Sequence, residues 1–135
     1  MTPSSTSSGS IFEEFCQLIL GMDKSIRFVG IATITGAILA TKYRANLTPL
    51  LTEEETAASI KDSVWRMESR RDVEEKLGKT LYVIATYEKV KRATIPVGKE
   101  GQSILIISFD SASDPESIIR NKILAVIKPY GAIGH

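Results

Sequence analysis

Apolar residues recur along this chain with two different periods, and these periods predict its helices and strands. Over residues 11–22 they return every three or four positions, which is the period of a helix with one buried face. Ser10 and Glu13 stand at the start of this stretch with the spacing of a capping box, in which each side chain binds the other's backbone amide. We therefore expect a first helix over residues 11–22.

Residues 26–43 change character, because they are β-branched and apolar with one interruption at Thr35 and Gly36. The pattern predicts two strands joined by a tight turn in which Gly36 supplies a positive φ. Apolar residues occupy both faces of these strands, so we expect helices to cover both faces of the sheet.

A second capping box, formed by Thr52 and Glu55, predicts the start of another helix. Charged residues occupy one face of this helix, and the other face carries an apolar stripe of Ala57, Ile60, Val64 and Met67. The stripe loses its phase through residues 69–72, so residues 52–77 are compatible with one bent helix or with two helices. Gly78 is suited to end the last turn.

Three further strands are predicted at 80–87, 92–97 and 103–109, and their short connections favour an antiparallel meander. Asp114 followed by Pro115 is a strong signal for the start of a last helix. The resulting order, α-β-β-α-β-β-β-α, predicts an α/β domain of the α+β type. Its five-stranded antiparallel sheet is expected to have helices on both faces.

The length of 135 residues fits a single domain, which we expect to span residues 11–130. The first ten residues are polar, so residues 1–10 are expected to be a disordered leader, and residues 131–135 a short tail. The longest charge-free stretch, residues 28–41, is shorter than the roughly 20 residues that a membrane helix needs. We expect a cytoplasmic protein that does not enter a membrane.

The content of cysteine and histidine excludes most classes of catalytic site and metal site. Cys16 is the single cysteine and lies among apolar residues, so we expect a buried thiol and neither a disulfide nor a zinc cluster. The single histidine is the last residue, His135, which excludes Ser-His, Cys-His and metal-His arrangements inside the domain. The net charge of +1, from 17 basic and 16 acidic residues, argues against dedicated nucleic-acid binding. We expect no enzymatic activity, no metal and no cofactor.

The tripeptide Gly78-Lys79-Thr80 matches the end of a phosphate-binding loop. That motif needs a glycine five residues before the Gly-Lys pair, where this chain has Val73. It also needs a strand before the loop and a helix after it, because the helix amides hold the phosphates. The predicted order here is reversed, so no nucleotide site is expected.

The helix of residues 52–77 carries the residues that we expect to meet a partner. Arg66, Arg70 and Arg71 gather around the break in the stripe, and arginine is enriched at protein interfaces. Trp65 flanks the stripe, where it can complete the core or face a partner. A second basic group, interpreted as a solvated hairpin, consists of Lys89, Lys91 and Arg92. Because a symmetric dimer lays the same surface of each copy against the other, the expected interface consists of Ile60, Val64, Trp65, Arg66, Met67, Arg70 and Arg71.

The chain resembles the roadblock (dynein light chain) family, within the wider profilin-like and longin-like group, over about residues 11–128. The resemblance rests on the order of the elements and on four local patterns. These are the opening pair IRFVGIATITGAILA, the capped helix from Thr52, the KLGKTLYVIATY entry to the third strand, and IPVGKEGQSILIISF, which closes the sheet. Gly36 stands where the family has an Asp-Gly or Asn-Gly turn, whereas Thr35 departs from the family's acidic or amide residue.

The resemblance implies a non-catalytic protein that forms homodimers or heterodimers, in which central helices pack together and sheets join edge to edge. Many similar proteins are scaffolds or regulators of small Ras-like GTPases, so the expected function is a dimeric adaptor that binds or regulates such a GTPase. The alternative is a small-molecule sensor of the related PAS or profilin-like architecture, with its ligand between sheet and helix. A sensor needs polar groups inside its pocket, and the apolar strand faces offer mainly Thr33, Thr80 and Thr86. The sequence therefore favours the adaptor.

Overall fold

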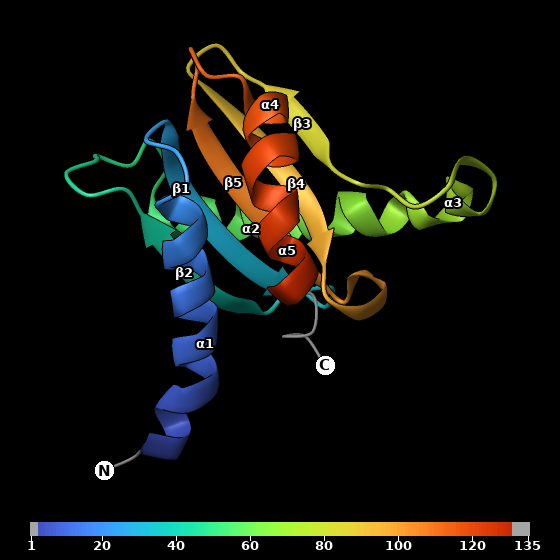
Figure 1. Cartoon of the computed structure of the whole chain (residues 1–135), viewed down its shortest axis with the longest axis horizontal. Helices are drawn as coiled ribbons and strands as arrows, with labels where there is room; N and C mark the ends of the chain where they lie inside the picture. The colour runs from blue at the N-terminus through green and yellow to red at the C-terminus, as the bar shows by residue number, and fades with distance from the viewer. Residues whose placement is uncertain (1–2, 131–135) are drawn as a thin grey trace.

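The computed structural model describes residues 3–130 and shows a central sheet with helices on both faces (Figure 1). Side chains are described for residues 11–127. The elements are α1 (Pro3–Leu20), β1 (Ile26–Thr33), β2 (Ile38–Tyr43), α2 (Glu53–Ser69), α3 (Arg71–Leu77), β3 (Val83–Thr86), β4 (Val90–Val97), the short helical turn η1 (Lys99–Gly101), β5 (Ser103–Asp110), α4 (Pro115–Ile118), the π-helical turn η2 (Ile119–Ile123) and α5 (Leu124–Tyr130).

The five strands are ordered β2-β1-β5-β4-β3, and every neighbouring pair is antiparallel. β3, β4 and β5 follow one another as the predicted meander, β1 pairs with β5, and β2 and β3 form the two edges. Gly36 has a φ of 93° in the turn between β1 and β2, as its place in the sequence predicts. The predicted α+β fold with a five-stranded antiparallel sheet is confirmed.

Two hydrophobic cores lie on the two faces of the sheet. On one face, α1 and the C-terminal helices bury Phe15, Ile19 and Ile119, among others. On the other face, α2 packs Ile60 and Val64 against the strands. Figure 1 shows this arrangement, with α1, α4 and α5 in front of the sheet and α2 behind it. Because the central strands are covered from both sides, β1 and β5 are buried at nearly every position.

Capping side chains place two of the helix starts where the sequence predicts them. Thr52 Oγ1 accepts the backbone N–H of Glu55 at 3.0 Å, and Glu55 Oε1 accepts the backbone N–H of Thr52 at 2.9 Å. The predicted capping box of α2 is therefore confirmed. The Asp114 carboxylate accepts the backbone N–H of Ser117, and Pro115 occupies the first turn of α4.

The first helix starts earlier than the sequence predicts. α1 begins at Pro3, so Ser10 lies inside the helix and the predicted start there is wrong. Residues 3–10 extend the helix away from the sheet (Figure 1), where we expected an unstructured leader. A capping pattern marks a possible start, but nothing in it stops a helix from continuing through the same residues. Residues 1–2 and the expected tail at 131–135 lie outside the described residues.

The lost phase of the apolar stripe corresponds to a real break in the helix. α2 and α3 are separate helices divided at Arg70, which decides between the two alternatives that the sequence leaves open. Gly78 ends α3 with a φ of 94°, as predicted. α3 has no buried residue and projects past the β3 edge of the sheet (Figure 1).

Candidate protein-binding surface

The apolar stripe of α2 is buried inside the chain. Ile60, Val64 and Met67 pack against the sheet, whose facing buried side chains are Phe28, Ala32, Ile104 and Ile106. The expectation that these three residues meet a second copy therefore needs correction. The stripe is required to cover this face of the sheet, and a periodic pattern alone does not say which surface covers it.

Trp65 lies off this stripe and is 69% exposed, so it does not complete the core. Next to it, Arg66 Nη2 lies 3.0 Å from Asp62 Oδ2 in a pair that is itself exposed. Exposed ion pairs of this kind contribute little to stability. A tryptophan left in water is one of the side chains that contribute most when a protein interface buries them.

Arg71 is used within the chain and does not belong to an open surface. Its Nε donates to Glu68 Oε2 at 2.7 Å, and its Nη2 donates to the carbonyl oxygen of Gly101 at 3.0 Å. The bond to Gly101 ties the start of α3 to the connection between β4 and β5, and the bond to Glu68 ties it to the end of α2. Of the three arginines predicted to face a partner, only Arg66 and Arg70 remain candidates.

The β3 edge of the sheet is open. β3 pairs with β4 on one side, and no element of residues 3–130 pairs with its other side. The segment that leads into β3 carries Leu77 and Leu81, which are 81% and 68% exposed. The Thr80 hydroxyl donates to Glu74 Oε2 at 2.7 Å, so the loop is fixed to α3. We call α3 with residues 78–81 the α3 arm.

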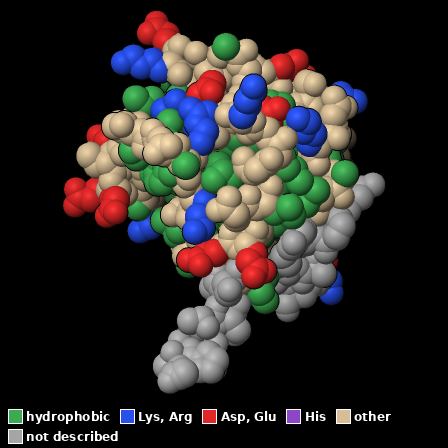
Figure 2. Space-filling model, turned by 60° about the vertical axis from the view of Figure 1, so that its left-hand side comes forward, with side chains coloured by type: hydrophobic (Ala, Val, Ile, Leu, Met, Phe, Trp, Pro, Cys, Tyr) green, Lys and Arg blue, Asp and Glu red, His purple; other side chains and the backbone are tan. Residues whose placement is uncertain are grey.

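The other side of the molecule also has exposed apolar residues, around β2 and the loop that follows it. They include Ile38, Tyr43, Leu50 and Leu51. Figure 2 shows the face reached by turning this side forward, where hydrophobic side chains lie open among Lys and Arg side chains. Exposed apolar surface alone therefore does not single out the β3 side. The charged groups beside each edge are needed to tell the two apart.

A groove of about 260 Å³ runs between α2 and β3, and all the charged side chains that line it are basic. We call it the arginine groove, and its lining residues are Ser63, Arg66, Arg70, Val83, Ile84, Ala85, Tyr87, Arg92 and Thr94. None of these is acidic, so the groove is a concave surface with three guanidinium groups and several hydroxyls. Guanidinium groups pair with carboxylates in a two-point geometry. The groove therefore suits an acidic partner.

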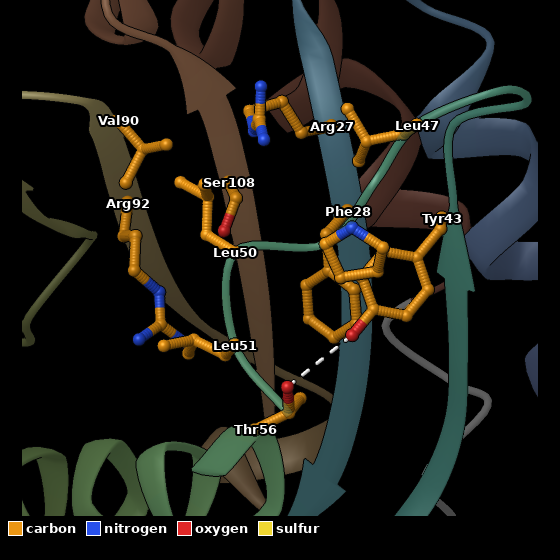
Figure 3. Close-up of a pocket in the computed structure, with 11 residues that line it drawn as sticks. Arg27, Phe28, Tyr43, Leu47, Leu50, Leu51, Thr56, Val90, Arg92 and Ser108 are labelled. Atoms are coloured by element: carbon orange, nitrogen blue, oxygen red, sulfur yellow. Dashed lines mark hydrogen bonds between the residues drawn. The ribbon is translucent and has the colours of Figure 1, made fainter. Parts of the chain in front are cut away.

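Arg92 belongs to this groove, although the sequence analysis interprets it as part of a solvated hairpin. It is half-buried on β4, and its Nη1 donates to the Ser59 hydroxyl of α2. Within the described side chains it forms no ion pair, and burial lowers the pKa of its guanidinium. Figure 3 shows the side chain reaching from β4 toward α2. The alternation of buried residues along β4 was the signal, because it places Arg92 on the face that α2 covers.

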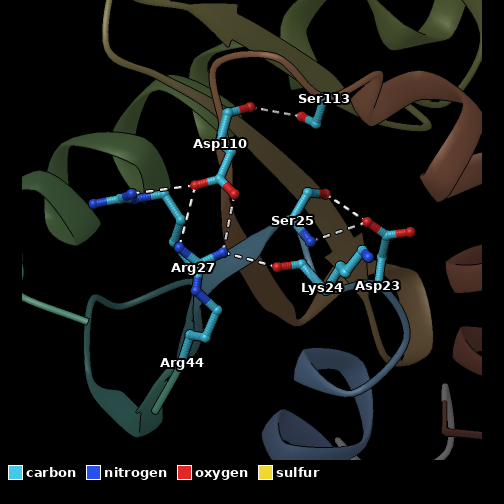
Figure 4. Close-up of polar contacts among 7 residues, drawn as sticks. All are labelled: Asp23, Lys24, Ser25, Arg27, Arg44, Asp110 and Ser113. Carbon is cyan, nitrogen blue, oxygen red and sulfur yellow. Dashed lines mark hydrogen bonds and ion pairs between the residues drawn. The ribbon is translucent and has the colours of Figure 1, made fainter. Parts of the chain in front are cut away.

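A polar cluster at the end of the sheet is structural (Figure 4). Asp110, the last residue of β5, accepts from Arg44 Nη1 at 3.0 Å and from Arg27 Nη1 at 3.2 Å. The hydrogen bond from Arg44, followed by that from Arg27, lowers the pKa of the Asp110 carboxyl. Arg44 Nη1 also donates to the carbonyl oxygen of Lys24 at 2.8 Å. The cluster joins three segments that are distant in the sequence.

The described part of the chain shows neither a metal cluster nor a membrane span. No group of three or more His, Cys, Asp or Glu side chains among these residues is arranged to hold a metal ion. No helix between residues 3 and 130 combines the length and the apolar character needed to cross a bilayer. Cys16 is buried as expected, and desolvation raises the pKa of its thiol to about 12.

Comparison with known proteins identifies the fold. No protein-family model matches the chain, and no curated protein matches its sequence. Among solved structures, MglB with tetrameric arrangement has a TM-score of 0.75 at 13% identity, covering 93% of this chain and 89% of that one. MglB of Myxococcus xanthus has a TM-score of 0.67 at 12% identity, covering 95% of this chain and 94% of that one. A Roadblock/LC7 domain of Streptomyces avermitilis has a TM-score of 0.66 at 8% identity, covering 87% of this chain and 95% of that one. The chain therefore has the Roadblock/LC7 fold, which it shares with MglB.

Proposed function

We propose that this chain is a non-catalytic adaptor that forms a homodimer through its β3 edge and binds a partner protein through the arginine groove. One observation carries the proposal. An open edge strand and an acid-free arginine groove lie together on the α2 and β3 side of the molecule. Of the two edges among the described residues, only β3 has beside it a groove with three guanidinium groups and no acidic lining residue.

The open edge of β3 supports the homodimer. An uncovered edge strand offers a row of backbone N–H and C=O groups, and proteins generally cover or blunt such edges. In a symmetric dimer the same strand of each copy pairs with the other around a twofold axis, which joins the two sheets into one. This arrangement covers the edge without requiring any other protein.

The α3 arm adds apolar area to the same interface. It projects past the β3 edge, so a second copy paired at that edge meets Leu77 and Leu81. Burying a leucine side chain contributes roughly 1.5–3 kcal/mol. The exposed leucines of the arm therefore take over the role that the sequence assigns to the buried stripe of α2.

The arginine groove supports an acidic partner, and a small Ras-like GTPase is the class that we propose. The resemblance to roadblock proteins implies such a partner, and the switch regions of these GTPases are often acidic. Arg66, Arg70 and Arg92 provide the complementary charge. An adaptor that regulates a GTPase must bind one nucleotide state more tightly than the other, because only differential affinity shifts an equilibrium.

Sedimentation equilibrium at micromolar concentration tests the homodimer with two matched leucine variants. We expect the wild-type chain to be a dimer. Leu77→Asp places a charge on the α3 arm and should raise the dissociation constant at least about tenfold, because a charge is costly inside an apolar contact. Neither leucine is buried, so both variants should remain folded.

Leu50→Asp is the control, since Leu50 is 57% exposed on the opposite side of the molecule. It should leave the dissociation constant unchanged. A wild-type chain that stays monomeric throughout the concentration range would remove the homodimer from the proposal. Equal weakening by the two variants would place the interface elsewhere.

A further inference from the structure

A second hollow lies on the same face of the sheet as α2, beneath the loop that joins β2 to α2 (Figure 3). Its volume is about 70 Å³, and its lining is mainly apolar. The walls include the rings of Phe28 and Tyr43, whose centroids are 4.8 Å apart, and Val90 on the other side. Leu50 and Leu51 of the loop cover it.

Two guanidinium groups line this hollow, and only one of them has a carboxylate partner. Arg27 pairs with Asp110, whereas Arg92 binds the hydroxyl of Ser59 and forms no ion pair within the described side chains. None of the lining residues is acidic. A half-buried cation without a counter-charge is unfavourable, and an anion bound beside it would relieve that cost.

The cover of the hollow is weakly attached. Leu50 is 57% exposed and Leu51 is 43% exposed, so each leaves about half of its apolar surface in water. Among the described residues, 48–51 make no hydrogen bond to the sheet. Displacing the two leucines therefore breaks few contacts, and another apolar group can take their place against Phe28 and Tyr43.

We propose that this hollow binds a small amphipathic anion, a carboxylate on a short aliphatic chain. The carboxylate pairs with the Arg92 guanidinium, which offers the two-point geometry that a carboxylate matches. The existing cavity is large enough for about two water-sized groups, since a water occupies roughly 30 Å³ in the liquid. It therefore accepts the headgroup, while the aliphatic chain displaces Leu50 and Leu51. The site shares Arg92 with the arginine groove, but no residue of β3 or of the α3 arm lines it, so it does not depend on the proposed homodimer.

An NMR titration with octanoate tests the site, with 1-octanol as a neutral probe of the same chain length. We expect octanoate to give saturable shifts centred on the amides of Phe28, Leu50 and Leu51. We expect 1-octanol to bind at least about tenfold more weakly, because its neutral hydroxyl cannot form the charge-assisted, two-point pair that a carboxylate forms with a guanidinium group. Absence of saturation by octanoate, or equal binding of the two probes, would overturn the proposal.

Two arginine variants locate the anion. Arg92→Met keeps the length of the side chain and removes its charge, so it should weaken octanoate binding about tenfold or more. Arg66→Met is the control, since Arg66 lines the arginine groove but not this hollow, and it should leave the affinity unchanged. Unchanged octanoate binding by a folded Arg92→Met variant would contradict the site. If that variant does not fold, the comparison of octanoate with 1-octanol on the wild-type chain decides.

Discussion

Gly30, in the middle of β1, leaves space for an aromatic side chain on the α2 face of the sheet. A Cβ atom at this position would lie 3.1 Å from Cζ of Phe28 and 3.2 Å from Cε2 of the same ring. The ring is also held by Tyr43, with centroids 4.8 Å apart and an angle of 51° between the rings. A methyl group at residue 30 would therefore require the Phe28 ring, which packs beside Tyr43, to shift by a few tenths of an ångström.

We predict that Gly30→Ala lowers the free energy of unfolding by about 1–3 kcal/mol, the usual cost of overpacking a close contact. Urea unfolding followed by circular dichroism measures the change. Gly21→Ala is the control, because a Cβ there would lie at an ordinary van der Waals distance of 3.6 Å from the Gln17 carbonyl oxygen. A Gly30 variant as stable as the Gly21 variant would show that Phe28 moves without cost.

For Arg92, the sequence predicts the strand on which the residue lies but not the groups that its side chain contacts. The sequence puts it on a hairpin with Lys89 and Lys91, where all three basic residues are expected to be solvated. The strand was predicted correctly, and its alternation determines that Arg92 lies on the α2 face. On that face its neighbours are Ser59, whose hydroxyl it binds, and Arg66, which lines the same groove. Both lie about thirty positions earlier in the chain, and only the packing of α2 brings them near Arg92. Local patterns contain no information about such a distant contact.

The elements themselves were predicted well, because their signals are local. The capping box at Thr52, the glycine turn and the strand periods each depend on a few neighbouring residues, and they placed β1, β2 and the start of α2. Two features did not follow from local patterns. The stripe of Ile60, Val64 and Met67 could cover the chain's own sheet or a second copy. In the structure it covers the chain's own sheet. The extension of α1 to Pro3 follows from no pattern in the sequence, and we have no physical account of it.

Three segments meet at Asp110, and this junction should respond to pH. Its neighbours, Arg27 and Arg44, lower the pKa of the carboxyl in the folded state. A group with a depressed folded pKa stabilises the fold above its unfolded pKa of about 3.9, and this contribution is lost as the pH falls through the folded pKa. The effect is moderated by solvent, because the Asp110 side chain is 38% exposed.

We predict that Asp110→Asn is less stable than the wild type at pH 7 and that the difference shrinks as the pH falls below about 4. Thermal unfolding across this pH range measures both curves. Asp62→Asn removes the carboxylate of an exposed pair with Arg66 and should have the smaller effect at pH 7. A stability difference for Asp110→Asn that is the same at pH 7 and at pH 3 would contradict the assignment.

In the proposed dimer, the two arginine grooves would lie on one face of the joined sheet. If β3 is the pairing edge, the two grooves would flank the twofold axis, because each groove lies between β3 and α2. The combined surface would be basic and concave. Long-range attraction to an acidic partner increases the rate of association and is screened by salt.

We predict that reversing two charges, Arg66→Glu with Arg70→Glu, slows association with a small Ras-like GTPase and flattens its dependence on salt. Stopped-flow mixing at several ionic strengths measures both. Lys61→Glu is the control, since Lys61 is exposed on α2 but does not line the groove. An equal effect of Lys61→Glu would mean that net charge, rather than the groove, controls the rate.

The pairing of two β3 strands is tested most directly by amide hydrogen exchange. Because the Tyr87 N–H bonds to Val90 within the hairpin, the alternation of an antiparallel ladder turns the amides of Ile84 and Thr86 outward, away from β4. A homodimer joined at this edge buries these two amides, whereas a monomer leaves them open to water. Exchange measured by NMR from dilute to concentrated protein should therefore slow at Ile84 and Thr86 as the concentration rises, while Val83 and Ala85 change little. Fast exchange at Ile84 and Thr86 at every concentration would contradict a dimer formed through β3.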